Sequence, residues 1–280
     1  MTYEDPFLDD ILAQPDEDVP RLLFADWLLD QPGPGQVARG EFIHLQCLLA
    51  RQAPGGLRPS DHLSRERAYL EEYSRTWGTP FQRLGCTCWE FRRGFVEGVA
   101  LPASVLLEHH RTLFRMGPLR ELRLTRCAGL VRSLAQIPQL GNVEILDLEN
   151  NFLDDHAFEE LFASPYLTRV RTLLLWSNRM ADHGMEALTQ ARMPGLTRLD
   201  LSHNQIGDEG ALTLANSELL GRLALLDLTA NRITDTGALA LASSPYAASL
   251  GWIDLSKNHI SQATQSILRE RLAGRVQVWG

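Results

Sequence analysis

The chain has 280 residues, of which 44% are hydrophobic, enough to bury the core of one large domain or two modest ones. Four cysteines are too few to staple a chain of this length, which favours a reduced, cytoplasmic protein over a secreted disulfide scaffold. The net charge of −8 disfavours non-specific nucleic-acid binding. The opening MTYEDPF has neither the basic nor the apolar region of a signal peptide, and no apolar run approaches the roughly 18 residues of a transmembrane helix, so we expect no membrane association.

Charge is distributed unevenly along the chain. Residues 1–31 hold nine acidic residues against Arg21, a balance of −8, whereas residues 80–135 hold nine arginines against four acidic residues, a balance of +5. Two interpretations are open: the two segments face each other in the fold, or the arginine-rich segment attracts an outside partner.

Residues 1–78 predict a small all-helical domain. Apolar spacing suggests a first helix, at Phe7, Leu8, Ile11 and Leu12. Asp18 and Pro20 open a second helix over RLLFADWLLD, because proline suits a first helical turn. The QPGPG stretch ends it, and a third helix runs through RGEFIHLQCLLARQ. After APGGLRPS, a fourth helix carries four apolar residues on one face, namely Leu63, Leu70, Tyr73 and Trp77. We expect Asp26 to form a partly buried ion pair with Arg39 or Arg21.

Residues 79–116 form an arginine-rich segment that we interpret as the N-terminal cap of the repeats that follow. Cys86 and Cys88, together with His109 and His110, offer ligand types that zinc accepts. Zinc sites prefer two to four residues between paired cysteines, so C-x-C is a poor match and two core cysteines are the favoured interpretation. No G-x-S-x-G, P-loop, G-x-G-x-x-G or H-E-x-x-H motif is present. We therefore expect no catalytic residue, no cofactor and no metal.

Residues 117–280 repeat one pattern, L-x-x-L-x-L-x-x-N/C, six times. Its asparagines are spaced by 27, 26, 27 and 27 residues, at Asn151, Asn178, Asn204, Asn231 and Asn258, with Cys127 in the first unit. The pattern and period resemble leucine-rich repeats. We expect the leucines to form the core and the asparagine side chains to satisfy backbone groups between units.

An aspartate follows each asparagine by four residues in the middle units, at Asp155, Asp182, Asp208 and Asp235. An aspartate before an Ala- and Leu-rich run predicts a helix start, with the carboxylate near the N–H groups of that helix. Each unit is then a strand followed by a helix, similar to the ribonuclease-inhibitor-like class. The resemblance implies an α/β fold: a right-handed solenoid with a parallel concave sheet and convex helices. Gln262 and Thr264 break the pattern in the last unit, and RVQVWG suggests a final edge strand.

The third, fifth and seventh positions of each unit are predicted to point out of the concave sheet, because side chains alternate along a strand. They combine a row of aspartates with large apolar residues. The candidate partner-binding residues are Ile145, Asp147, Leu174, Trp176, Arg198, Asp200, Leu225, Asp227, Trp252 and Asp254. Tryptophans beside charge are typical binding anchors, which favours a basic partner with an apolar anchor. The alternative is that these aspartates and tryptophans only fill and pack the sheet.

The N-terminal stretch FLDDILAQPDEDVPRLLFADWLLD, followed by RGEFIHLQC, resembles the repeat-companion domain found before leucine-rich repeats in planctomycetes and similar large-genome bacteria. The matching residues are Pro20, Arg21, Leu22, Ala25, Asp26, Trp27, Leu28, Arg39, Gly40, Glu41, Phe42, Ile43 and Gln46. The stretch WEFRRGFVEGV at 89–99 is similar to the segment that bridges the companion domain to the repeats. The resemblance implies an interaction protein and no known activity for the companion domain.

The sequence thus predicts a helical companion domain at 1–78, a cap at 79–116 and six repeats with a C-terminal cap at 117–280. The predicted function is non-catalytic protein binding on the concave face. A polyanion or nucleic-acid binder acting through the arginine-rich cap is the first alternative, and a metal-dependent enzyme is the second. The sequence leaves the oligomeric state open.

Overall fold

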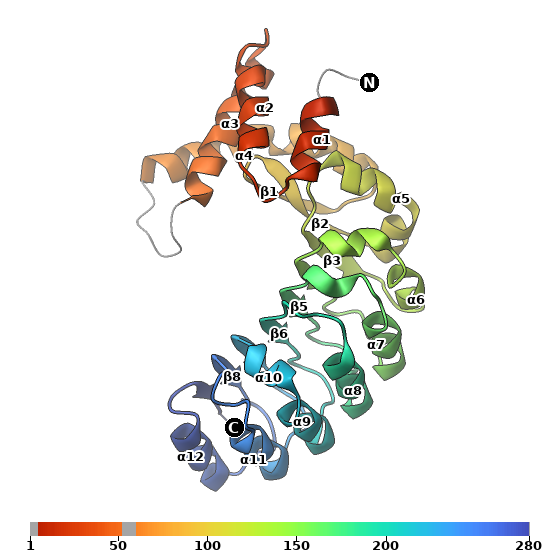
Figure 1. Cartoon of the computed structure of the whole chain (residues 1–280), viewed down its shortest axis with the longest axis vertical. Helices are drawn as coiled ribbons and strands as arrows, with labels where there is room; N and C mark the ends of the chain where they lie inside the picture. The colour runs from red at the N-terminus through yellow and green to blue at the C-terminus, as the bar shows by residue number, and fades with distance from the viewer. Residues whose placement is uncertain (1–4, 52–59, 280) are drawn as a thin grey trace. The chain divides into compact units, whose positions relative to one another are not determined.

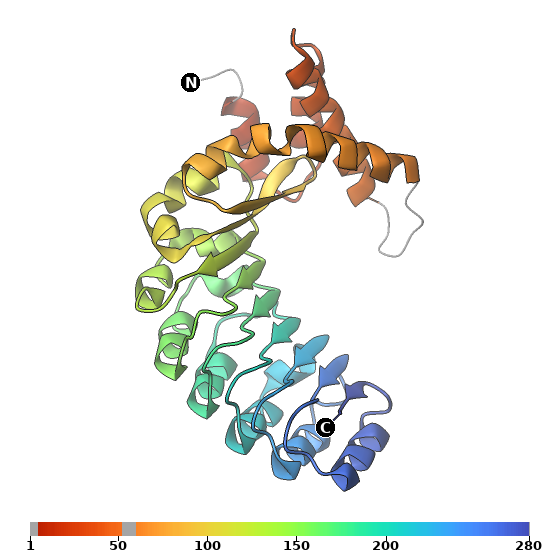
Figure 2. The ribbon, with the colours of Figure 1, turned by 180° about the vertical axis from the view of Figure 1, so that it is seen from behind.

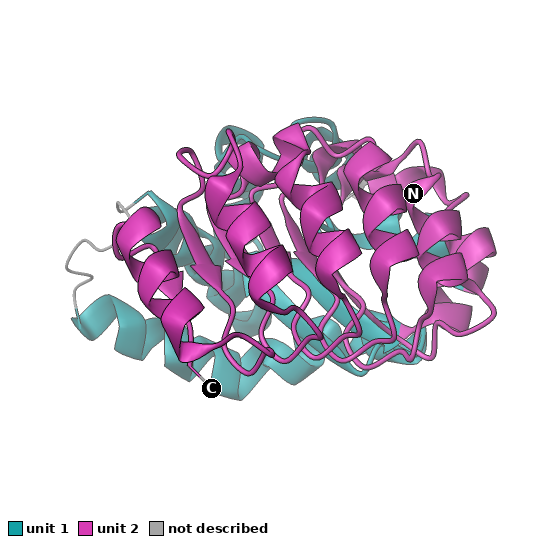
Figure 3. Cartoon of the chain, turned by 90° about the horizontal axis from the view of Figure 1, so that it is seen from below, with its two compact units in different colours: residues 1–101, 109–120 teal, residues 102–108, 121–280 magenta. Residues whose placement is uncertain are grey.

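The computed structural model describes residues 5–51 and 60–279, and Figures 1 and 2 show the chain from opposite sides. The chain divides into two units (Figure 3). Unit 1 lies within residues 1–101 and 109–120, and unit 2 comprises residues 102–108 and 121–280. Within the described ranges, no helix has the length and apolarity needed to cross a bilayer.

Unit 1 begins with the predicted helices. They are α1 (Asp5–Ala13), α2 (Val19–Leu29), α3 (Pro34–Ala50) and α4 (Ser60–Arg83). Pro20 lies in the first turn of α2, where a proline costs no helical hydrogen bond. Pro34 likewise opens α3, so the predicted QPGPG break is confined to a short turn that ends at Gly33. Most of the predicted APGGLRPS break lies outside the described residues.

An antiparallel hairpin follows the helices, formed by β1 (Cys88–Arg92) and β2 (Phe95–Pro102). Its two-residue turn consists of Arg93 and Gly94, both with positive φ (46° and 83°), as a hairpin turn that matches the strand twist requires. The N–H of Gly94 donates to Oε1 of Gln46 at 2.7 Å, which ties the turn to α3. A Cβ at Gly94 would lie 2.4 Å from Ile43, so this turn accepts only glycine.

The core of unit 1 is small and mostly apolar. Its buried residues are Ile11, Ala25, Leu28, Ile43, Cys47 and Phe95, with Leu8, Leu22, Phe24 and Trp27 packed around them. A Cβ on Gly40 would lie 2.8 Å from the carbonyl oxygen of Ala25. The absence of that Cβ lets α3 approach α2 closely.

In unit 2 the predicted strands form a parallel sheet in chain order. They are β3 (Glu121–Thr125), β4 (Ile145–Asp147), β5 (Thr172–Leu174), β6 (Arg198–Asp200), β7 (Leu225–Asp227), β8 (Trp252–Asp254) and β9 (Val276–Gln277). The register aligns equivalent repeat positions, so Leu173, Leu199 and Leu226 lie side by side and are fully buried. The final edge strand predicted from RVQVWG is confirmed as β9.

Helices cover one side of this sheet, as Figure 2 shows for the stacked units. They are α5 (Ala103–Met116, shared with unit 1), α6 (Val131–Leu134), α7 (Asp155–Phe162), α8 (Asp182–Gln190), α9 (Asp208–Ala215), α10 (Glu218–Arg222), α11 (Asp235–Ser243) and α12 (Gln262–Arg271), with 3-10 turns η1 (Pro138–Asn142) and η2 (Leu167–Arg169). Four of them begin at the predicted aspartates, so the predicted strand-then-helix unit is confirmed.

The repeated asparagines join each unit to its neighbour, as predicted. Oδ1 of Asn204 accepts the N–H of Met180 from the preceding unit at 3.0 Å. Its Nδ2 donates to the carbonyls of Leu175 and Leu201 at 3.0 and 3.1 Å. Asn178 and Asn231 make the corresponding bonds. Each buried backbone group left without a partner would cost about 1–3 kcal/mol, so the asparagines stabilise the stack substantially.

The helix-start aspartates act differently from the prediction. Oδ1 of Asp182, the first residue of α8, accepts the N–H groups of Gly207 and Gly210 at 2.7 and 3.0 Å, at the start of the next unit's helix. Asp208 repeats this arrangement toward Thr234 and Gly237. The prediction that each carboxylate serves its own helix was wrong, because the stacking of the units brings it onto the N-terminus of the following helix.

The glycine of each unit makes room for that carboxylate. A Cβ on Gly210 would lie 2.6 Å from Oδ1 of Asp182. We expect Gly210→Ala to lower the free energy of unfolding by about 1–3 kcal/mol, because the methyl group must displace the carboxylate from its hydrogen bonds. Gly195→Ala is the matched control, since its Cβ would lie 3.7 Å from the nearest atom. Chemical denaturation followed by circular dichroism measures both, and equal effects of the two substitutions would contradict this account.

Candidate functional site

The predicted concave-face residues line one side of the sheet of unit 2, opposite the buried leucines. Arg198 is exposed, and most of the others are partly exposed: Ile145, Leu174, Trp176, Asp200, Leu225, Asp227 and Trp252. Asp147 and Asp254 are buried, with exposed fractions of 2% and 8%, and do not offer open carboxylates as the sequence suggested. Asp147 is instead held by Arg123, whose Nε lies 2.7 Å from its Oδ2. Whether this face binds a partner stays a prediction.

A structural task of the aspartate row went unnoticed at the sequence level. In four successive units the fifth-position carboxylate accepts the backbone N–H two residues later: Asp147 from Glu149, Asp200 from Ser202, Asp227 from Thr229 and Asp254 from Ser256. These bonds are 2.8–3.0 Å long and turn the chain at the end of each strand. The D-x-S/T spacing in LDLS and LDLT was the available signal.

A hollow of about 470 Å³ lies on this face, across the ends of β5, β6 and β7. It is lined by Glu149, Trp176, Asp200, Ser202, His203, Asp227 and Thr229. The rings of Trp176 and His203 meet edge to face at 5.8 Å, which holds the indole at the rim. Glu149 and His203 were not among the predicted site residues, because neither occupies the third or fifth position of its unit.

The carboxylates of the hollow repel one another. Burial raises the pKa of Asp227, the neighbouring Asp200 and Asp254 raise it further, and the hydrogen bonds from Thr229 oppose the shift. Burial also raises the pKa of Glu149, and Asp147 and Asp200 add to this effect while Arg123 counteracts it. A cation placed in the hollow would relieve this repulsion.

Comparison with known proteins concerns mainly these repeats. Residues 194–215 and 224–242 match the family model described as "Leucine Rich repeat". The repeats of unit 2 are leucine-rich repeats. No curated protein matched the chain. A solved structure, an internalin (inlF) from Listeria monocytogenes, is similar at 20% identity over 57% of this chain, with a TM-score of 0.33. The similarity spans about half of the internalin, 53% of its length.

The zinc-type residues sit before the leucine-rich repeats, in unit 1. Cys86 is buried, and its burial raises the pKa of its thiol to about 11, whereas Cys88 is exposed. Across residues 5–51 and 60–279, no three His, Cys, Asp or Glu side chains are grouped so that they could hold a metal ion.

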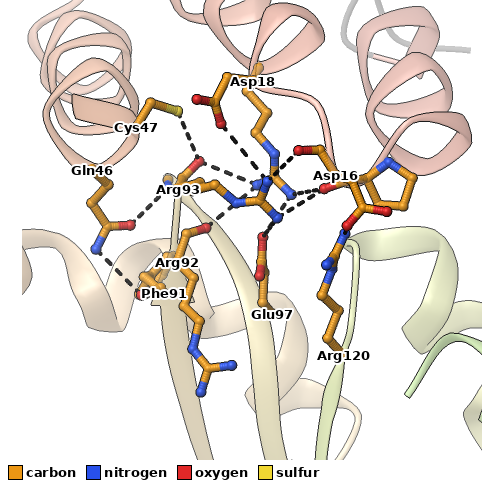
Figure 4. Close-up of polar contacts among 12 residues, drawn as sticks. Asp16, Asp18, Gln46, Cys47, Phe91, Arg92, Arg93, Glu97 and Arg120 are labelled. Carbon is orange, nitrogen blue, oxygen red and sulfur yellow. Dashed lines mark hydrogen bonds and ion pairs between the residues drawn. The ribbon is translucent and has the colours of Figure 1, made fainter. Parts of the chain in front are cut away.

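The arginine-rich segment contacts the acidic segment within unit 1, which supports the first of the two interpretations of their charge. Nη2 of Arg120 lies 2.6 Å from Oδ1 of Asp16, and Arg93 lies 3.8 Å from Asp18 (Figure 4). Arg93 also donates to the carbonyls of Pro15 and Asp16 at 2.9 and 3.0 Å. Two of the arginines that might attract a polyanion are thus engaged within the chain.

The most buried charge in the described residues is Arg21, which α2 directs toward the hairpin. It is fully buried, and its Nη2 lies 2.6 Å from Oε1 of Glu97, which is 3% exposed. Arg93 approaches the same Glu97 oxygen at 3.1 Å. The expected pairing of Asp26 with Arg39 or Arg21 was wrong: Asp26 meets His44 at 2.8 Å, and the partner of Arg21 comes from β2, 76 residues away.

We expect Glu97→Ala to lower the free energy of unfolding by about 3–5 kcal/mol, because it leaves a buried guanidinium without its carboxylate. Glu90→Ala is the control, since Glu90 pairs with Arg92 at 3.3 Å on the exposed side of the hairpin and should cost less than about 1 kcal/mol. Urea denaturation of both variants measures the difference. A loss for Glu97→Ala no larger than for Glu90→Ala would show that the buried pair is not stabilising.

The raised pKa of Asp227 predicts a pH dependence of stability. A folded-state pKa above the unfolded one means that the folded state holds the proton more tightly, so stability falls as pH rises through that window. Asp227→Asn keeps an oxygen for the Thr229 N–H and removes the charge. We expect this variant to be more stable than the wild type at pH 7, with the difference vanishing below the ordinary Asp pKa of about 3.9.

Thermal melts from pH 3 to pH 7 test this expectation. Asp235→Asn is the opposite control, because hydrogen bonds from Ser261 lower the pKa of Asp235, so this aspartate stabilises the fold above the ordinary Asp pKa. If both variants shifted stability in the same direction at pH 7, the assignment would be incorrect.

Proposed function

We propose that this chain is a non-catalytic interaction protein that binds a protein partner on the concave face of its leucine-rich repeats. The partner segment is extended and basic, and it carries an apolar residue beside its charge. The observation that carries the proposal is the hollow in which Trp176 stands beside Glu149, Asp200 and Asp227.

The electrostatics of the hollow favour a cationic side chain. Carboxylates on adjacent strands face each other in register, Asp200 beside Asp227, and their mutual repulsion contributes to the raised pKa of Asp227. An arginine or lysine of the partner would lower that repulsion and could lie against the face of Trp176. The fold already uses one bond of each aspartate to hold its turn, so the carboxylates are positioned before binding.

Apolar side chains continue the surface on both sides of the hollow. Leu174 lies beside Asp200 in the register, and Leu225 lies beside Trp252. These partly exposed side chains give an apolar residue of the partner a place next to the carboxylates. An alternation of basic and apolar residues in the partner fits this arrangement.

The alternative functions have less support. A polyanion binder acting through the arginine-rich segment would compete with Asp16, Asp18 and Glu97 for Arg93 and Arg120. An enzyme would need to exclude water from its reacting groups, and a hollow on a concave sheet leaves them in contact with solvent. We also propose that residues 1–78 are a repeat-companion domain and residues 79–116 a cap.

Selection from a displayed library of random peptides tests the proposed function. We expect the selected peptides to be rich in Lys and Arg with at least one large apolar residue. Trp176→Ala should weaken their affinity by about 2 kcal/mol, roughly 30-fold, because it removes the anchor. Asp200→Arg should weaken it through charge repulsion, and isothermal titration calorimetry gives the dissociation constants.

The control is Phe152→Ala, which removes an aromatic ring that is 65% exposed and lies outside the hollow. It should leave the affinity unchanged. Selected peptides without excess basic charge, or an equal loss with Phe152→Ala, would refute the proposed site.

A further inference from the structure

Unit 1 carries a stripe of exposed apolar side chains that its fold does not explain. Val19, Leu23 and Leu29 of α2 are 61%, 57% and 39% exposed, and Leu48 of α3 is 46% exposed. The exposed large apolar residues of unit 2 come instead from separate elements: Phe152, Leu212, Ile267 and Trp279. A contiguous apolar patch on a folded surface marks an interaction site more often than scattered residues do.

The stripe borders a groove of about 410 Å³ between three helices of unit 1. Leu22 and Leu29 of α2 form one wall, and Leu45 and Leu48 of α3 form the floor. His62 and Arg65 of α4 form the other wall.

The helices around the groove alternate in direction. Arg51 meets Asp18 at one end of α3 and His44 meets Asp26 nearer the other end, so α2 runs antiparallel to α3. Gln46 meets Glu66 and Glu41 meets Tyr69, so α4 also runs antiparallel to α3. Figure 1 shows α2 and α3 side by side.

Charge is arranged diagonally across the groove. The acidic residues Asp26 and Asp30 lie on the α2 wall, beside the N-terminal half of α3. The basic residues His62 and Arg65 lie on the α4 wall, beside its C-terminal half. Opposite charges therefore stand on opposite walls and at opposite ends.

The charges on the floor follow the same diagonal. Glu41 lies at the N-terminal end, on the α4 side, where it accepts the hydroxyl of Tyr69. Arg51 lies at the C-terminal end, on the α2 side, where it pairs with Asp18. His44 pairs with Asp26 between them.

We propose that this groove pairs two copies of the chain. A two-fold axis through the middle of the groove exchanges both walls and both ends. It sets Asp26 and Asp30 of one copy against Arg65 and His62 of the other, and Glu41 against Arg51. The apolar stripes then cover each other, which gives the self-complementary contact that a symmetric dimer requires. A partner of uniformly basic or acidic charge would be attracted by one wall and repelled by the other.

Sedimentation equilibrium of the full chain tests the proposal. We expect the wild type to be dimeric at micromolar concentrations and Leu23→Asp/Leu48→Asp to be monomeric. Leu212→Asp, which alters a leucine of α9 with a similar exposure of 51%, should remain dimeric. A monomeric wild type at 100 µM, or a dimer that the double variant leaves intact, would overturn the proposal.

Charge reversal provides a second measurement that does not depend on the apolar substitutions being tolerated. Asp26→Arg and Arg65→Asp should each weaken the dimer about tenfold or more, because each sets like charges against each other across the axis. The two changes together should restore dimerisation to near the wild-type level. If the combined variant is no better than the single ones, the diagonal pairing is wrong.

Discussion

The structure of unit 2 depends on how backbone groups are satisfied where very short strands end. Most of its strands are only three residues long, so each unit leaves N–H and C=O groups inside the stack that the sheet does not pair. The asparagine of the following unit accepts one of these N–H groups and donates to two carbonyls. Because the donors and acceptors come from consecutive units, no unit is complete alone, and the repeat period is fixed by this exchange.

A second exchange runs on the helical side and explains the Asp–Gly spacing. Each helix-start aspartate serves the N-terminus of the next helix, and a glycine there gives its oxygen room. The two ladders tie both sides of every unit to its neighbour. A one-residue change in repeat length would break both, which is consistent with spacings that vary only between 26 and 27 residues.

The sequence predicted what is periodic and missed what occurs once. The leucine core, the strand–helix order and the role of the asparagines follow from a pattern repeated six times. The direction of the aspartate bonds did not follow, because spacing along the chain does not reveal which neighbouring helix a carboxylate reaches. The Arg21–Glu97 pair was also missed, since two residues 76 positions apart share no periodic signal.

The concave face shows the same limit. Its aspartates were predicted to be open binding groups, yet each holds a turn, and Asp147 and Asp254 are buried. The aspartate row is therefore partly a consequence of the fold. What distinguishes this face are the residues that depart from the repeat, such as Trp176, Glu149 and His203, and these gather at one hollow.

The two proposed surfaces differ in the symmetry of their chemistry. The concave hollow is acidic throughout, so it suits a partner of opposite charge and cannot pair with itself. The groove of unit 1 carries both signs on a diagonal, so it is its own complement. A chain that pairs through the groove would present two concave faces in one assembly. A partner with two basic segments would then bind the second at an elevated effective concentration, so that modest affinity at each hollow would suffice for stable capture.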